Sequence, residues 1–291
     1  MKHQRAFLAS PFSFLWFFLL LTLSFYGKVS SSDNSAKDES PVMGKSEWRT
    51  ITSTEYGEVS AIDVKDGHRL PFHLQFFKLE PNSLFLPVLL HADMLFYVHT
   101  GSGRLIWAYD GNSKTINLRQ GDICMLGAGF VFYLQSNLEA QRQRLRIFAI
   151  FPNSIHNHYD PAIGAYSRIS ELVGGFDQKI MQAAFGVPEE LAAEISEKTK
   201  TPAIVHAVSK EKNNILKLEA WILNGVFGGE TAIDVSSNNN KPGKYNVFDK
   251  QPDFKNRYGW SLMVTQKHLK SLKHINIGFL MVNLTAVSGS T

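Results

Sequence analysis

The sequence predicts a mainly β protein built around a small β-barrel or jelly roll, and residues 86–137 carry this prediction. Met94 to His99 form an apolar run without helical spacing, as expected of a strand. Across residues 104–109, Leu, Trp and Tyr recur at every second position, as in a half-buried strand. Glycine turns at Gly101 and Gly121 bound these segments. Short strands with a turn roughly every ten residues are typical of a small barrel or jelly roll.

Three short motifs in this stretch also carry a family resemblance. They are Val98 to Gly103, Gly121 to Ile123, and Ala128-Gly129 followed by Phe132 to Leu134. Together they resemble the two sequence motifs of the cupin barrel. Within the cupins the chain most resembles the vicilin-type (7S globulin) seed storage proteins, supported by Ala183 to Leu191, Tyr258 to Ser261 and Val282 to Thr285. The resemblance covers roughly residues 45–291 and implies a cupin (jelly-roll β-barrel) with a helical arm and an incomplete second cupin.

The N-terminus has the pattern of a secretory signal peptide, predicted over residues 1–29. Lys2 and Arg5 precede an apolar stretch, residues 12–26, and small residues follow it. A retained signal anchor is the alternative, because the uncharged stretch approaches the ~20 residues that span a bilayer. Either reading places the folded part in the secretory pathway, and cleavage would leave no stable membrane association. The resemblance implies a protein storage vacuole or the extracellular space. Residues 30–44 lack apolar periodicity and are predicted to be a disordered lead-in.

Charge and cysteine content narrow the possible partners and chemistry. The formal net charge of the 291-residue chain is only +4, without a block of Lys or Arg, so nucleic acid is not expected as a partner. Cys124 is the single cysteine, which excludes an intramolecular disulfide. It falls inside a predicted strand, and we expect a buried, unreactive thiol.

The remaining sequence predicts a barrel followed by a helical arm. The N-terminal barrel is predicted over residues 45–160 and a helical arm over 161–210. Asp177 can cap a helix that runs to Phe185 with Gly186 as its left-handed end, and Pro188 suits the first position of a second helix. In vicilins such an arm packs on a neighbouring subunit of a trimer, so the resemblance implies a homo-oligomer. Packing of the helices on their own barrel is the alternative.

Residues 211–250 are predicted to hold a strand and a linker, and residues 251–291 the start of a truncated C-terminal cupin. Tyr258-Gly259-Trp260-Ser261 matches Tyr56-Gly57-Glu58-Val59, and residues 277–284 match residues 72–79 as the next apolar strand. A barrel with only its first strands would leave edges unpaired. Two explanations stay open here: a truncated product, or strands that pair with the first barrel.

The resemblance also shows where a cupin enzyme would hold its metal with three histidines and one glutamate. Two histidine positions fall among Val88, Leu89 and Leu90, the glutamate position is Met94, and the third histidine position is Phe132. None of these side chains offers the imidazole nitrogen or carboxylate oxygen that such a site uses. We therefore predict no catalytic, cofactor-binding or metal-binding residue.

Other histidines give only weak alternatives. His91 and His99 lie near the ligand positions but do not coincide with them. His156, His158 and Asp160 could bring two imidazoles and a carboxylate together, but we expect a polar surface loop there. Asn283 begins the Asn-Leu-Thr sequon, so glycosylation of Asn283 is possible in the secretory pathway.

Three functions are therefore considered. The first is a non-enzymatic, vicilin-like nutrient reservoir. The second is a metal-dependent, germin-type oxidase or dismutase, which would need ligands outside the usual motifs. The third is a module that binds a small ligand inside the barrel. The sequence argues against this function, because we expect the side chains of Val88, Leu90, Met94 and Phe132 to fill the barrel interior.

Overall fold

The computed structural model describes residues 47–64, 72–109, 112–139, 141–152, 159–173, 176–186, 188–196, 202–207 and 242–285. The predicted signal peptide and lead-in lie outside these ranges. Within them, no helix is long and apolar enough to cross a membrane.

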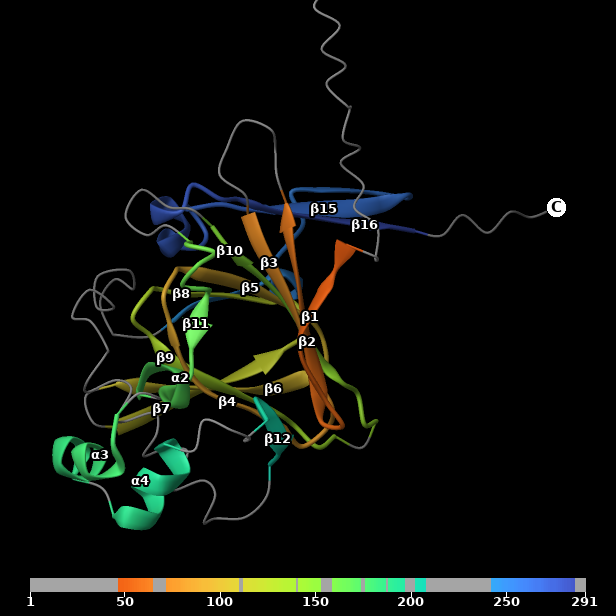
Figure 1. Cartoon of the computed structure of the whole chain (residues 1–291). Coiled ribbons are helices and arrows are strands. Elements are labelled where there is room, and N and C mark those ends of the chain that lie inside the picture. Colours follow the sequence, from red (N-terminus) through yellow and green to blue (C-terminus); the bar gives the residue numbers. More distant parts are fainter. Residues whose placement is uncertain are drawn as a thin grey trace, which may run out of the picture. The chain divides into compact units, whose positions relative to one another are not determined.

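Two antiparallel sheets face each other around the core (Figure 1). The first has the strand order β1 (Arg49–Thr54), β2 (Gly57–Val64), β3 (Phe72–Leu79), β10 (Leu145–Phe151), β5 (Met94–Thr100), β8 (Asp122–Leu126) and β13 (Gly243–Asn246). The second has the order β11 (Tyr166–Ser167), β4 (Ser83–Leu90), β9 (Val131–Ser136), β6 (Ser102–Tyr109) and β7 (Asn112–Arg119), with β12 (Ile204–His206) also paired to β4. The prediction of a mainly β jelly roll is confirmed, as two packed sheets rather than one continuously hydrogen-bonded barrel.

Side chains from both sheets fill the space between them. Strand β10 shows the pattern most simply, because Leu145, Ile147, Ala149 and Phe151 are buried and alternate with more exposed residues. Such alternation is expected where one face of a strand meets the core. The largest fully buried side chains are aromatic: Trp107, Phe77, Phe85, Phe96, Phe132 and Phe151.

Three short helices cover the outer face of the second sheet: α2 (Ile169–Val173), α3 (Gln178–Phe185) and α4 (Glu189–Ser196). The predicted caps of α3 are confirmed. The Asp177 carboxylate accepts a hydrogen bond from the Lys179 backbone N–H at 2.7 Å, and Gly186 is left-handed with φ of 62°. Pro188 precedes α4 instead of opening it, because its carbonyl accepts the first helical hydrogen bond, from Ala192.

The buried helix residues contact the chain's own barrel. Val173, Met181 and Ala192 form one apolar cluster with residues of β4, β6 and β9, namely Leu84, Leu86, Leu89, Ile106, Val131 and Tyr133. This explains why β4 is buried on both faces. The helices therefore contact their own barrel through these residues, and packing of the arm on a neighbouring subunit stays a prediction.

Downstream of residues 208–241, which are not described, the chain returns to the first sheet. Strand β13 pairs with β8, and its side chains reach Asp122, which is fully buried. Lys244 Nζ lies 2.8 Å from one Asp122 carboxylate oxygen, and Asn246 Nδ2 donates to the other at 2.8 Å. Within the predicted strand and linker segment, residues 211–250, the residues Gly243–Asn246 therefore form the edge strand of the first sheet.

A third sheet follows, formed by β14 (Phe254–Asn256), β15 (Gly259–Val264) and β16 (Phe279–Leu284). Among the described residues its strands hydrogen-bond only to one another, so they do not pair with the first barrel. Contact with the barrel is made by side chains instead. Leu262 and Val264 of β15 join a buried cluster with Leu95, Ile123 and Met125, which lie on the outer face of β5 and β8.

The third sheet repeats the pairing of β1, β2 and β3. Gly57 lies opposite Leu79 in the first set, and Gly259 lies opposite Leu284 in the second. The Glu80 N–H donates to the Tyr56 carbonyl at 2.9 Å, and the Thr285 N–H donates to the Tyr258 carbonyl at 2.8 Å. The match between Tyr56-Gly57 and Tyr258-Gly259 seen in the sequence therefore extends to the hydrogen bonds.

Candidate functional site

The positions where a cupin enzyme would hold its metal lie in the barrel centre and are occupied by buried apolar side chains. Val88, Leu90, Met94 and Phe132 are at most 1% exposed and belong to the core between the sheets. Val88 lies directly opposite Phe132 in the β4–β9 register. Leu89 points the other way, into the cluster under the helices. Of the three candidate positions on β4, Val88 and Leu90 thus point inward, and neither can donate an electron pair to a metal.

The histidines considered from the sequence do not converge. His91 Nε2 lies 2.7 Å from the Ser167 hydroxyl, and burial lowers the pKa of His91 below its ordinary value. His99 is exposed and stacks on Phe148 with ring centres 4.8 Å apart. Asp160 accepts a hydrogen bond from the Ala162 N–H in a turn, and His156 and His158 lie outside the described residues. Within the described ranges, no three His, Cys, Asp or Glu residues form a group that could hold a metal.

One buried histidine was missed by the sequence analysis. His73 on β3 is 1% exposed, and its Nδ1 lies 2.7 Å from the Asp63 carboxylate. Its Nε2 lies 2.9 Å from the Gln75 amide nitrogen, and its ring stacks on Tyr159. These contacts fit a neutral ring that donates from Nδ1 and accepts at Nε2. Burial lowers the pKa of His73, an effect that the hydrogen bond to Asp63 partly offsets.

The signal that could have found His73 is the alternation of β3. In this strand His73, Gln75, Phe77 and Leu79 face the core, while the more apolar set of Phe72, Leu74 and Phe76 faces outward. Hydrophobicity alone therefore suggests the wrong face. The register between β2 and β3 places Asp63 opposite His73, which supplies the partner that allows its burial.

Cys124 and Asn283 have the surroundings that matter for their chemistry. Cys124 is fully buried, and burial raises the pKa of its thiol far above the usual range. The prediction of a buried cysteine is confirmed. Asn283 lies in β16 opposite Trp260 and is exposed. Its glycosylation stays a prediction.

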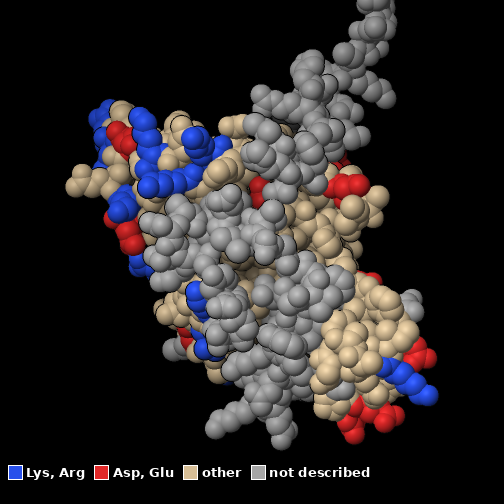
Figure 2. Space-filling view, turned by 90° about the vertical axis from the view of Figure 1, so that its left-hand side faces the viewer, with Lys and Arg blue, Asp and Glu red and all other residues tan. Residues whose placement is uncertain are grey.

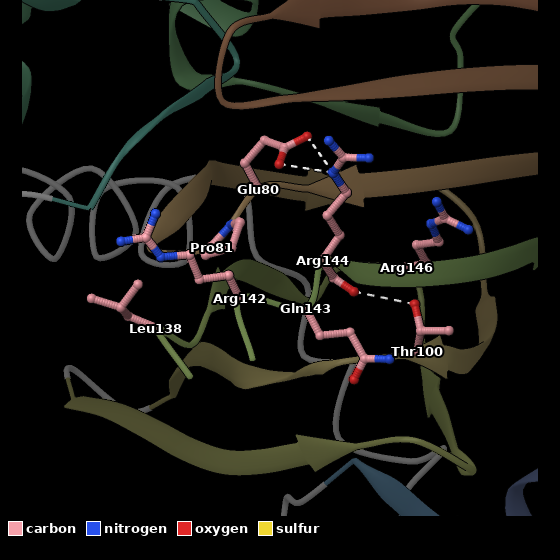
Figure 3. Close-up of a pocket in the computed structure, with 8 residues that line it drawn as sticks. All are labelled: Glu80, Pro81, Thr100, Leu138, Arg142, Gln143, Arg144 and Arg146. Carbon is pink, nitrogen blue, oxygen red and sulfur yellow. Dashed lines mark hydrogen bonds and ion pairs between the residues drawn. The ribbon is translucent and has the colours of Figure 1, made fainter. Parts of the chain in front are cut away.

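A polar pocket of about 640 Å³ opens at one end of the first sheet (Figure 3). It is lined by Glu80, Pro81, Thr100, Leu138, Arg142, Gln143, Arg144 and Arg146. Arg144 Nε lies 2.7 Å and 2.8 Å from the two Glu80 carboxylate oxygens, and the Thr100 hydroxyl donates to the Arg144 carbonyl at 3.1 Å. The sequence analysis did not single out this pocket, although Arg142, Arg144 and Arg146 at alternate positions were a visible signal.

Comparison with known proteins identifies the family of this chain. The family described as Cupin matches residues 45–192, which is about half of the chain. The chain belongs to the cupin family. Its predicted resemblance to vicilin-like proteins is confirmed by two vicilin-like seed storage proteins of Arabidopsis thaliana. One is 39% identical over 89% of this cupin and the other 37% identical over 83% of it.

Solved structures share the fold of this cupin. Vicilin from hazelnut, Corylus avellana, superposes with a TM-score of 0.62 at 18% identity and covers 84% of this chain and 64% of its own. A mutant of the Bacillus subtilis oxalate decarboxylase has a TM-score of 0.53 at 14% identity, over 78% of this chain and 54% of its own. This cupin spans 36% and 49% of the length of the two Arabidopsis relatives.

Proposed function

We propose that this cupin is a non-enzymatic, vicilin-like protein that serves as a nutrient reservoir. The observation that carries the proposal is the apolar, closely packed barrel centre at Val88, Leu90, Met94 and Phe132. A metal-dependent oxidase or dismutase needs nitrogen and oxygen ligands at these places. A small-ligand-binding barrel needs a hollow interior, whereas here the side chains occupy it.

Protein abundance during seed development tests the reservoir role. Targeted mass spectrometry of maturing and germinating seeds of the source plant should show this cupin accumulating during maturation and disappearing after germination. A low, constant level at all stages would contradict a reservoir. Metal analysis of the purified protein by ICP-MS tests the enzymatic alternative separately, because stoichiometric Mn, Fe or Zn would support a germin-type activity.

The same proposal includes a homo-oligomer within the secretory pathway, in a storage vacuole or outside the cell. The support is the resemblance to vicilins together with a predicted signal peptide at residues 1–29. Light scattering of the purified protein should give the mass of a trimer. A monomer at all concentrations tested would contradict the oligomer without affecting the reservoir role.

We also propose that β14, β15 and β16 are the opening strands of a second cupin. The support is a position-by-position match between their exposed face and the core-facing side of β2 and β3. The matched pairs are Val59 with Ser261, Ala61 with Met263, Gln75 with Leu280, Phe77 with Val282 and Leu79 with Leu284. The first member of each pair is buried, whereas Met263, Leu280, Val282 and Leu284 are exposed.

The apolar dye ANS can test this second proposal. Native protein should bind ANS, because an apolar barrel wall is exposed, and the Leu280→Ser, Val282→Ser double variant should bind clearly less. The matched control is Phe148→Ser, which removes an exposed apolar side chain from the first sheet. Equal dye binding by all three proteins would contradict the proposal.

A further inference from the structure

The lining of the pocket in Figure 3 carries more positive than negative charge. It holds three guanidinium groups and one carboxylate, a net of 3 − 1 = +2. Glu80 is paired with Arg144. Within the part of the chain that the structure describes, the guanidinium groups of Arg142 and Arg146 have no hydrogen-bond or ion-pair partner. Lys78 lies opposite Arg146 in the β3–β10 register, and Glu58 lies opposite Lys78 in the β2–β3 register, so these two neighbours add no net charge beside the pocket.

All three arginines line the pocket because of the way the chain enters β10, with Arg142 and Arg146 on opposite sides of Arg144 (Figure 3). Leu145 and Ile147 of β10 point into the core, so Arg144 and Arg146 point outward. Arg142 precedes them in a turn closed by a 2.9 Å hydrogen bond from its N–H to the Glu139 carbonyl. Figure 3 shows the three side chains spread along the pocket, with Gln143 and Thr100 beside each other below Arg144.

The backbone of Arg142 is an independent sign that this arrangement is held in place. Arg142 has a φ of 47°, in the left-handed region that residues other than glycine rarely adopt. The other described non-glycine residues with positive φ, Asn82 and Asn276, are asparagines, which tolerate this region. A strained arginine among like charges costs free energy, and such strain clusters at binding sites.

We propose that this pocket binds a small phosphomonoester. Guanidinium groups bind phosphate through paired, charge-assisted hydrogen bonds, and a phosphomonoester carries about −1.5 to −2 charges at pH 7, which matches the lining's net charge. The volume of about 640 Å³ leaves room for an organic group beside the phosphate. The Gln143 amide and Thr100 hydroxyl provide polar contacts for that group, and Pro81 and Leu138 provide an apolar edge.

Isothermal titration calorimetry with glycerol 2-phosphate, at fixed ionic strength, tests the proposal. Wild-type protein should bind one equivalent saturably, and acetate, a monoanion, should bind far more weakly. Loss of a charge-assisted hydrogen bond corresponds to about tenfold in affinity. We therefore expect about a tenfold increase in Kd for Arg146→Gln and a larger increase for the Arg142→Gln, Arg146→Gln double variant.

The matched control is Arg104→Gln, which removes the same charge from an exposed arginine on β6 that is bonded to Gln135 outside the pocket. Its Kd should equal that of wild type, and circular dichroism should show that all variants are folded. Inorganic phosphate as a second probe identifies the source of the dianion, since tighter binding of glycerol 2-phosphate supports an organic ester. No saturable binding, equal binding of acetate, or equal weakening by Arg104→Gln would overturn the proposal.

Discussion

Gly57 and Gly259 occupy equivalent positions in two different sheets, and each lies against the backbone of the neighbouring strand. A Cβ on Gly57 would come within 2.4 Å of the Lys78 carbonyl oxygen. A Cβ on Gly259 would come within 2.1 Å of the Asn283 carbonyl oxygen. Both glycines have a large positive φ, 156° and 151°. The same tight turn therefore needs glycine twice, for the same steric reason.

Gly57→Ala should destabilise the protein, because the new methyl group collides with a backbone that cannot move without breaking the β2–β3 pairing. We expect a loss of about 1–3 kcal/mol in the free energy of unfolding, measured by urea denaturation. Gly164→Ala is the matched control, since Gly164 also has positive φ but its Cβ would meet nothing within 4 Å. If both variants lost the same stability, backbone strain and not the close contact would be the cause.

Met94→Glu should be strongly destabilising, because it places a carboxylate at the barrel centre without a partner. Met94 is 1% exposed, and a carboxylate buried in apolar surroundings costs at least about 3 kcal/mol at neutral pH. Met263→Glu makes the same change at a residue that is 50% exposed and should alter stability by about 0.5 kcal/mol or less. Thermal and urea denaturation measure both. A Met94→Glu protein as stable as wild type would contradict a packed barrel centre.

Stability should fall on mild acidification because of His73. Burial lowers its pKa below the ordinary value of 6.5, so the unfolded chain takes up a proton more readily than the native protein. Stability is therefore full above about pH 6.5 and falls, by at most about 1.4 kcal/mol per pH unit from this residue, as the pH drops toward the folded pKa. His91, whose pKa is also lowered by burial, contributes in the same direction.

Urea denaturation at pH 7.5 and pH 5.5 checks this expectation. His73→Gln should be less stable than wild type at pH 7.5 but should lose less stability between the two pH values. His99→Gln, at an exposed position, should keep the wild-type pH dependence. A His73→Gln protein with an unchanged pH dependence would assign the effect to other groups.

Cys124 should be unreactive in the native protein, because it is fully buried and its thiol stays protonated. Ellman's reagent at pH 8 should give no thiol signal until denaturant is added, and one thiol per chain afterwards. A matched exposed thiol, introduced as Lys255→Cys in β14, should react at once. Rapid reaction of native wild-type protein would show that the β8 region opens readily.

Features that depend on neighbouring residues in the sequence could be predicted, whereas features that depend on strand pairing could not. The caps of α3, Asp177 and Gly186, are local signals and were predicted correctly. The face of β3 and the burial of His73 were not, because they depend on the pairing with Asp63 across two strands. The Arg142 to Arg146 pocket was missed for the same reason: alternation lines up the charges, but only the fold brings Glu80 and Thr100 beside them.

Charge is also distributed unevenly at a scale that sequence order hides. Figure 2 shows Lys and Arg concentrated toward the upper end of the face that it displays, whereas Asp and Glu lie at both its upper and its lower end. Lys267, Lys270 and Lys273 are exposed on the short helix η5 (Lys270–His274) and the turn before it, and Glu189 and Glu190 are exposed at the start of α4.

The pairing of β13 with β8 sets an order for events during synthesis. Asn246 and Asp122, which are hydrogen-bonded, lie 124 positions apart in the chain. A ribosome adds about 5–20 residues per second, so the edge of β8 waits at least several seconds for its partner. During that interval its backbone groups are open to the wrong strands, including those of another nascent chain. The nascent protein therefore passes through a vulnerable period that ends only when residues 243–246 leave the ribosome.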